Sequence, residues 1–161
     1  MRVRWLLPLA ALALPASAGA QTPPPGQQTP QALFGGLIVN DPGTAPDVRS
    51  QLTSGAAFVA ARPQFADLTG DGRMDAVVQV RVPGAAGTVG VYAFSTDGAP
   101  DNQLRAVLRS QTLYRATVAV APGTLLITVP NYREGDEVCC PAERNERRYG
   151  WDARRHRLRR R

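Results

Sequence analysis

From residue 78 onward, apolar side chains recur at every second position of the chain. Val78, Val80 and Val82, for example, alternate with Gln79 and Arg81. Successive side chains of a strand point to opposite faces, so this pattern predicts strands with one buried face and one wet face. The same alternation recurs in segments 89–94, 104–109, 115–120, 125–129, 145–151 and 156–160.

Short turn sequences separate these segments. Pro122-Gly123 fits the two central positions of a type II turn, and Pro83-Gly84 and Asp97-Gly98 also favour turns. Strands joined by short connections pair antiparallel, because a parallel pair needs a long crossover. The sequence therefore predicts an antiparallel β meander.

One helix is predicted ahead of the strands, over residues 44–52. Thr44 is a candidate N-cap, Pro46 falls in the first turn and Gly55 follows the end. A helix of two to three turns needs to pack against something. We therefore expect an α+β fold: a single small domain over residues 44–161, mostly an antiparallel β meander with one short N-terminal helix.

The N-terminus has the pattern of a cleavable export signal. Arg2 and Arg4 precede an apolar segment over residues 5–15, and small residues end at Ala20. We expect cleavage after Ala20, a secreted or extracytoplasmic chain, and no membrane span after cleavage. Residues 21–43 are predicted to be a Pro/Gln-rich linker followed by an irregular segment.

The charge of the chain is concentrated at its C-terminus. All 19 basic residues are Arg, which excludes mechanisms that need a lysine amine. Six of them lie in residues 154–161, and without these the exported chain is close to neutral. A near-neutral body argues against a nucleic-acid-binding domain.

The sharpest local motif is an acidic turn over residues 67–75. It places oxygen-bearing side chains at positions 1, 3, 5 and 9 of a calcium-loop template, with Gly at position 6. A bare turn explains the same residues, since Asp and Gly are both favoured in turns. The candidate metal ligands are Asp67, Thr69, Asp71, the backbone carbonyl of Arg73, and Asp75.

This turn resembles the D-x-x-x-D-G-x-x-D hairpin loops of FG-GAP and other β-rich extracellular proteins. In those loops calcium ties two strands together, so the resemblance implies a structural calcium ion, weakly bound. The sequence contains no second copy of the motif, which leaves a β-propeller unsupported.

Cys139 and Cys140 are adjacent and are the only cysteines. Three arrangements stay open: a disulfide between the two neighbours, unbridged buried thiols, or disulfides to a second chain. Asp136 and Glu137 would raise a nearby thiol pKa, which argues against an activated thiolate.

The segment from Tyr132 to Pro141, with the later Arg148-Tyr-Gly-Trp-Asp152, is similar to a Y-x-x-G-D-x-x-C-C-P…R-Y-x-W-D pattern. That pattern resembles small exported proteins and lipoproteins of actinobacteria, of the LppP/LprE type. The chain lacks their lipobox cysteine. The resemblance implies location and domain type, and it transfers no catalytic residues.

The C-terminal arginines have two interpretations. They can grip an anionic envelope polymer through guanidinium groups, or they can flank a final strand that points Leu158 into the core. No aromatic residues are interleaved, so specific nucleic-acid recognition is not expected. The candidate polymer-binding residues are Arg154, Arg155, Arg157, Arg159, Arg160 and Arg161.

No catalytic constellation is evident in the sequence. Common nucleophile and metalloprotease motifs are absent, and His156, the only histidine, lies among the terminal arginines. We therefore expect a monomeric, non-catalytic exported domain of the cell envelope or extracellular space, structural or ligand-binding. The alternatives are an extracytoplasmic thiol-redox or small hydrolytic enzyme, and a polyanion-binding protein acting through the arginine-rich end.

Overall fold

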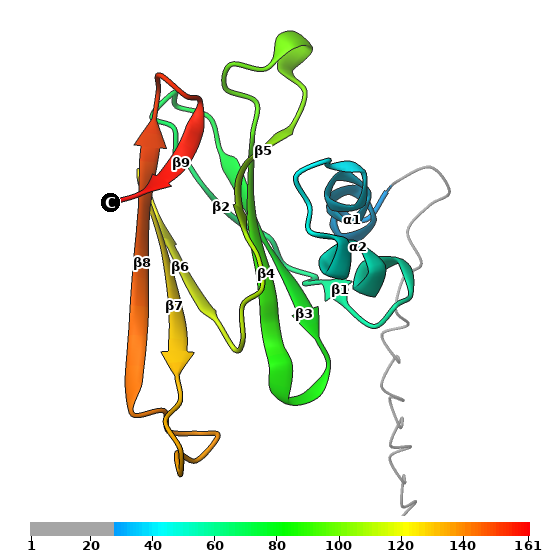
Figure 1. Ribbon diagram of the computed structural model, residues 1–161. Coiled ribbons are helices and arrows are strands. Elements are labelled where there is room, and N and C mark those ends of the chain that lie inside the picture. The colour runs from blue at the N-terminus through cyan, green and yellow to red at the C-terminus, as the bar shows by residue number, and fades with distance from the viewer. Residues whose placement is uncertain (1–27) are drawn as a thin grey trace, which may run out of the picture.

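A computed structural model describes residues 28–161 and shows three layers (Figure 1). Two helices lie on one side, a five-stranded sheet lies in the middle and a four-stranded sheet lies on the other side. The expected signal, residues 1–20, and the first part of the expected linker fall outside the described residues. The described part contains no helix long and apolar enough to cross a membrane.

Every strand pairing is antiparallel, which confirms the predicted α+β meander. The first sheet has the order β1-β3-β4-β5, with β2 also paired to β3, and the second has the order β6-β7-β8-β9. Short 3₁₀ turns, η1 (Gly84–Ala86) and η2 (Pro100–Asn102), lie before β4 and β5. The strands are β1 (Phe58–Val59), β2 (Gln64–Ala66), β3 (Asp75–Val82), β4 (Gly87–Ser95), β5 (Arg105–Ser110), β6 (Thr117–Ala121), β7 (Thr124–Asn131), β8 (Glu143–Asp152) and β9 (Arg157–Arg160).

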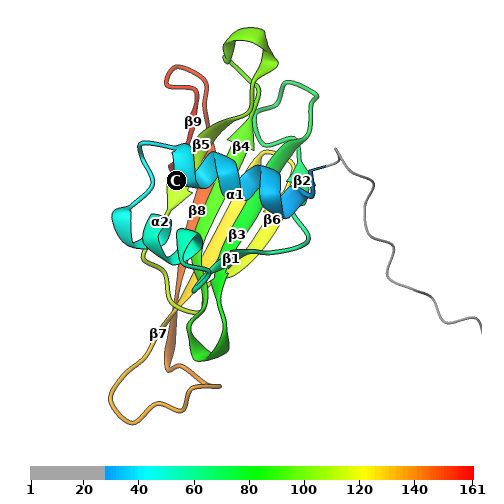
Figure 2. The same ribbon diagram turned by 90° about the vertical axis from the view of Figure 1, so that its right-hand side faces the viewer.

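The prediction of an irregular segment up to residue 43 was wrong, because a helix, α1 (Pro30–Asn40), forms there. Thr29 caps it by accepting a hydrogen bond from the Ala32 N–H at 3.2 Å, and proline occupies the first turn. Phe34 and Ile38, four residues apart, are buried against the first sheet. Figure 2 shows α1 lying across the strands. This burial offsets the cost of two glycines inside the helix, about 1 kcal/mol each.

The second helix, α2 (Pro46–Thr53), matches the predicted helix, but its predicted cap was wrong. Ala45 occupies the N-cap position, and no side chain caps the helix. Thr44 is buried instead. The Ala45 N–H donates to the Gln111 side-chain oxygen at 2.6 Å, so a tertiary contact replaces the local one.

Both faces of the first sheet are buried, so the expectation of one wet face was wrong for its central strands. Val77 is 2% exposed and its neighbour Val78 is 0% exposed. Val77 faces the second sheet and Val78 faces the helices, in two separate hydrophobic clusters. Two covered faces explain why β3 and β4 carry near-continuous apolar runs.

The second sheet keeps the predicted alternation. Leu125 and Ile127 are fully buried between the sheets, and Leu158 of β9 joins them, as predicted for the final strand. Tyr149 and Trp151 of β8 pack against the same cluster. The other face of this sheet, here called the outer face, points away from the first sheet (Figure 1).

An ion pair between the buried Asp41 and the exposed Arg109 fastens the end of α1 to β5. Arg109 donates from Nε and Nη2 to the two oxygens of Asp41, at 2.6 and 2.9 Å. Arg49 of α2 donates to the carbonyl groups of Val39 and Asp41, at 3.0 and 2.9 Å. Gln111 links the same region to the buried Tyr92, whose hydroxyl donates to it at 2.7 Å. These bonds set the position of both helices on the sheet.

Burial would raise the pKa of Asp41, but hydrogen bonds from Arg109 and from the Gly43 N–H outweigh it. The pKa of Asp41 therefore lies below its ordinary value of 3.8. Because the folded state binds this proton less readily than the unfolded state, the carboxylate stabilises the fold above pH 3.8. The contribution is lost as pH falls through the lowered pKa.

We expect Asp41→Asn to reduce the free energy of unfolding at neutral pH by about 1.5–3 kcal/mol, because it breaks a charged hydrogen-bonded pair. Urea unfolding should show this loss near neutrality and a smaller difference from wild type in strong acid. Asp101→Asn is the matched control, since Asp101 is exposed and makes no ion pair with a described residue. Equal losses in the two variants would contradict this role for Asp41.

Candidate functional site

Cys139 and Cys140 are joined by a disulfide, one of the three arrangements that the sequence left open. Their Cα atoms lie 3.8 Å apart, and both residues are exposed. The pair lies in the loop that connects β7 to β8, at the lower end of the second sheet in Figure 1. Because the covalent ring spans only two residues, it stiffens this loop locally and constrains the unfolded chain little.

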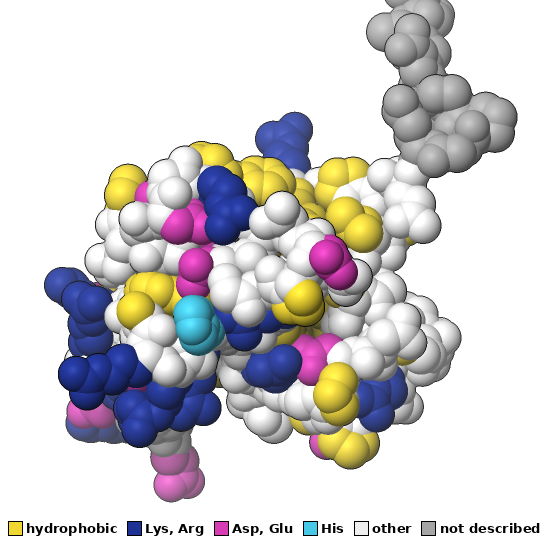
Figure 3. Space-filling view, turned by 90° about the horizontal axis from the view of Figure 1, so that it is seen from above, with side chains coloured by type: hydrophobic (Ala, Val, Ile, Leu, Met, Phe, Trp, Pro, Cys, Tyr) yellow, Lys and Arg dark blue, Asp and Glu magenta, His cyan; other side chains and the backbone are white. Residues whose placement is uncertain are grey.

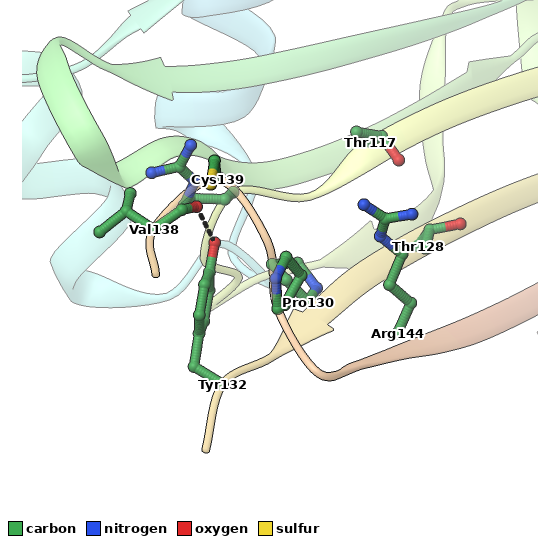
Figure 4. Close-up of a pocket in the computed structure, with 9 residues that line it drawn as sticks. Thr117, Thr128, Pro130, Tyr132, Val138, Cys139 and Arg144 are labelled. Atoms are coloured by element: carbon green, nitrogen blue, oxygen red, sulfur yellow. Dashed lines mark hydrogen bonds between the residues drawn. The ribbon is translucent and has the colours of Figure 1, made fainter. Parts of the chain in front are cut away.

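Three hydrogen bonds hold the disulfide loop closed. The Tyr132 hydroxyl donates to the Val138 carbonyl oxygen at 2.9 Å, as the dashed line in Figure 4 shows. One carboxylate oxygen of Asp136 accepts hydrogen bonds from the N–H groups of Arg133 and Ala142, each at 2.8 Å. The Asp136 carboxylate therefore links the two ends of the loop, near Arg133 and Ala142.

The two backbone hydrogen bonds, from Ala142 first and Arg133 second, lower the pKa of Asp136 from its ordinary value of 3.8. The carboxylate therefore stays ionised and keeps both bonds at neutral pH. As pH falls through the lowered pKa, these bonds weaken and the loop loosens.

A pocket of about 160 Å³ lies beside the disulfide. The disulfide loop forms one wall, and the outer face of the second sheet forms the floor. The floor assignment follows from register, since Thr128 and Pro130 alternate with core-facing residues of β7 and pair with Thr117 and Arg144. Figure 4 shows how these side chains surround the space. The lining residues are Arg115, Thr117, Thr128, Pro130, Tyr132, Val138, Cys139, Pro141 and Arg144.

The pocket carries positive charge. Arg115 and Arg144 line it, and neither forms an ion pair with an acid of the described residues. Arg115 has a φ of 51°, in the left-handed region that is rare for residues with a side chain. Its N–H donates to the Ala86 carbonyl oxygen at 2.9 Å, which holds this strained residue in place. Two guanidinium groups and two threonine hydroxyls suit an anionic ligand with hydroxyl groups.

The surroundings of the disulfide disfavour thiolate chemistry. A carboxylate oxygen of Glu137 lies 3.4 Å from the Cys139 sulfur. Negative charge at that distance destabilises a thiolate on reduction. Glu137, Cys139 and Cys140 are also the one group of three metal-ligating side chains that the described residues bring within 4.8 Å. Bridged sulfurs are not thiolates, so such a site would require prior reduction.

In the acidic turn, the carboxylates accept hydrogen bonds from the chain itself. Asp67 accepts from the N–H groups of Gly70 and Gly72, at 2.6 and 3.0 Å. Asp75 is 2% exposed and accepts from Leu68 and Thr69, at 2.8 and 3.1 Å. These bonds are those of a turn stabilised by its own aspartates.

Asp71 is engaged by Arg73, whose backbone N–H and guanidinium both donate to its carboxylate. The pKa of Asp71 lies below its ordinary value of 3.8, chiefly because of the Arg73 N–H bond. Calcium binding here stays a prediction, and a bound ion would have to compete with or share these donors.

The two predicted motifs do not form one site. The Asp67 carbonyl oxygen accepts from the Gly123 N–H at 2.8 Å, so the acidic turn touches the β6–β7 turn. The disulfide loop follows the other end of β7, an eight-residue strand and therefore about 25 Å away. Gly123 has a φ of 67°, as the predicted type II turn requires.

The arginine-rich end is divided by the structure. Arg154 and Arg155 lie in the β8–β9 turn, while Arg157 and Arg159 lie on β9 and flank the buried Leu158. His156 is not isolated, because its Nδ1 lies 3.1 Å from an Asp97 oxygen in the loop between β4 and β5. This contact joins the upper ends of the two sheets.

Most residues that line the pocket could not be predicted from the sequence. Thr117 and Thr128 lie on β6 and β7, and Arg115 lies just before β6. All three are more than ten residues from the cysteines and carry no local signal. From the sequence, Asp136 is noted only for its effect on the nearby thiols, whereas its carboxylate holds the loop closed. Its position three residues after Arg133, in a loop with Gly135, was the available signal.

Comparison with protein-family models, with curated proteins and with solved structures found no match. The similarity to LppP/LprE-type proteins therefore stays a hypothesis based on the motifs of the chain.

We expect Asp75→Ala to lower the free energy of unfolding by about 2–3 kcal/mol, because two N–H groups lose their acceptor. Asp71→Ala, at an exposed ion pair with Arg73, should cost clearly less than Asp75→Ala, because solvent screens the pair. Chemical denaturation of both variants in EDTA measures the difference without metal.

Adding calcium tests the metal prediction separately. A bound ion would raise the melting temperature of the wild type and leave Asp71→Ala unchanged. Identical melting curves of the wild type in EDTA and in millimolar calcium would leave the bare turn as the correct interpretation.

Proposed function

We propose that this chain is a non-catalytic domain, exported from the cytoplasm, that binds an anionic ligand in the pocket beside its vicinal disulfide. The observation that carries the proposal is the pocket itself. Its wall is a covalently stiffened loop, and its lining includes two arginines without ion-pair partners among the described residues.

Preorganisation supports a binding role. The disulfide, the Tyr132 hydrogen bond and the Asp136 bridge restrict the loop before any ligand arrives. A loop that is already ordered loses less entropy on binding, which leaves more of the interaction energy as affinity. The ring of Tyr132 also packs edge-on against the ring of Tyr114, with the ring centroids 5.8 Å apart. This contact anchors the start of the loop to the segment before β6.

The export signal and the disulfide support one location. A disulfide between exposed cysteines persists in an oxidising compartment and is reduced in the cytoplasm. The apolar N-terminal segment that ends at Ala20 directs the chain to such a compartment. Both features fit a domain of the cell envelope or extracellular space, as does the motif similarity to LppP/LprE-type proteins.

The pocket is tested by titrating the protein with inorganic phosphate and following the side-chain Nε–H signals of arginine by NMR. We expect the signals of Arg115 and Arg144 to shift, and expect the response of the Arg115 signal to weaken in Arg144→Gln. Arg62→Gln is the matched control, because Arg62 is exposed and remote from the pocket lining. A uniform response of all arginines would contradict a specific site.

The covalent wall is tested with the double variant Cys139→Ser, Cys140→Ser. Its melting temperature should change by only a few degrees, since the ring is small. Its phosphate response should weaken, because the loop loses its constraint.

Export is tested by expressing the full chain in a secreting bacterial host, fractionating the cells and sequencing the N-terminus. We expect a product that begins at Gln21 in the extracytoplasmic fraction, with Cys139 and Cys140 bridged in the unreduced peptide. An uncleaved chain in the cytoplasm, carrying free thiols, would refute the proposed location.

A further inference from the structure

The outer face of the second sheet carries a continuous set of arginines that begins at the pocket. Strand register places Arg144 and Arg148 on this face, opposite Pro130 and Leu126 of β7. Arg157 and Arg159 of β9 pair with Asp152 and Gly150, which share the face. Figure 3 shows basic side chains gathered on this side of the molecule.

The C-terminal Arg161 extends the same surface. Its backbone N–H donates to the Arg148 carbonyl oxygen at 2.8 Å. Its guanidinium group lies against Gly150, where a Cβ would collide with it. Glycine at this position therefore lets Arg161 lie against β8. Together the outer-face arginines form a basic surface from the pocket to the chain end, here called the arginine track: Arg144, Arg148, Arg157, Arg159 and Arg161.

Most of this charge is unneutralised. Asp152 is paired with Arg155 at 3.2 Å and with Arg159 at 3.7 Å. Arg144, Arg148, Arg157 and Arg161 form no ion pair with a described residue. Arg157 and Arg159 are alternate residues of β9 and lie about 6.5–7 Å apart, whereas Arg144 and Arg148 of β8 lie four residues apart, roughly twice that distance.

We propose that this track binds an acidic polysaccharide, with one carboxylate-bearing sugar seated in the pocket and the chain lying along the outer face. The inference rests on the proposed function and extends its ligand from one anionic group to a polymer. Guanidinium groups form paired hydrogen bonds to carboxylates. Thr117 and Thr128 in the pocket offer partners for sugar hydroxyl groups.

The acids within the track favour a polysaccharide over a polyphosphate or nucleic acid. Glu146 lies on the outer face between Arg144 and Arg148, opposite Thr128. A carboxylate there accepts hydrogen bonds from sugar hydroxyls, whereas the polyphosphate and DNA backbones carry no hydroxyl donors along the chain to offset their repulsion from it. The aromatic side chains of β8, Tyr149 and Trp151, pack into the core, so the face offers no platform for stacked bases.

The composition of the face also argues against a membrane surface. The large exposed hydrophobic residues of the described chain are Leu33, Phe58, Phe65, Met74, Tyr114 and Val138. None of them lies on a strand of the second sheet. A peripheral membrane domain would need apolar groups beside its basic ones to enter the lipid.

The test uses protein purified after expression of the full chain and calorimetric titration with polygalacturonate. We expect salt-sensitive binding, weakened about tenfold in the triple variant Arg148→Gln, Arg157→Gln, Arg161→Gln. The triple variant Arg62→Gln, Arg73→Gln, Arg81→Gln, at exposed arginines outside the second sheet, has the same net charge and should bind like wild type. Equal weakening in both variants would reduce the effect to net charge and overturn the proposal.

Glu146→Gln separates the polymer classes. It should weaken polygalacturonate binding or leave it unchanged, and it should strengthen binding of polyphosphate and oligothymidine, which are repelled by this carboxylate. Tighter binding of polyphosphate, oligothymidine or phosphatidylglycerol vesicles than of polygalacturonate by the wild type would overturn the assignment.

The proposed function and this inference can fail separately. If the arginine signals respond to phosphate but the protein does not bind polygalacturonate, the anion-binding pocket is supported and the polysaccharide-binding track is rejected. If polygalacturonate binding persists in Arg144→Gln but is lost in the outer-face triple variant, the track is supported and the role of the pocket is rejected.

Discussion

The burial of both faces of the first sheet is the constraint on which the rest of the structure depends. Val77 and Val78 are adjacent, and each is removed from water by a different layer. The helices must therefore stay on one face and the second sheet on the other. The Asp41–Arg109 pair, with Arg49 and Gln111, fixes the helical layer by bonds that reach across the chain. With the helices held there, the second sheet covers the opposite face with one of its own faces, and no described helix or strand covers its outer face.

The outer face of the second sheet carries the outward-pointing arginines and the pocket. The buried side of β7, β8 and β9 is occupied by Leu125, Ile127, Tyr149, Trp151 and Leu158, so alternation directs the intervening arginines outward. The disulfide loop closes over one end of this face and converts part of it into a pocket. The opposite end of the sheet is tied to the acidic turn, whose aspartates are occupied with backbone N–H groups. The proposed binding pocket and the structural turn thus lie at opposite ends of one sheet.

Much of the fold could be predicted from local sequence. The seven alternating segments correspond to strands, the Pro122-Gly123 turn joins β6 and β7, and α2 occupies the predicted helical segment. Errors arose where a tertiary contact overrides a local preference. Glycines 35 and 36 disfavour a helix, yet α1 forms because Phe34 and Ile38 are buried. Thr44 is a residue type favoured at N-caps. In the structure it is buried instead, and the Ala45 N–H donates to the Gln111 side-chain oxygen. The pocket also depends on contacts between distant segments, since the pairing of Thr117 with Thr128 brings β6 and the preceding Arg115 to the disulfide loop.

The sequence by itself determined the antiparallel meander, the inward direction of Leu158 and the adjacency that lets Cys139 and Cys140 bridge. These are local properties, set by residue type, spacing of two and turn chemistry within a few positions. The tertiary structure alone decided that the strands divide into two sheets, that β3 and β4 are covered on both sides, and that the pocket and the arginine track share one face. Those outcomes depend on which distant segments pair and stack. Alternation specifies that a strand has two different faces, but packing decides what each face meets.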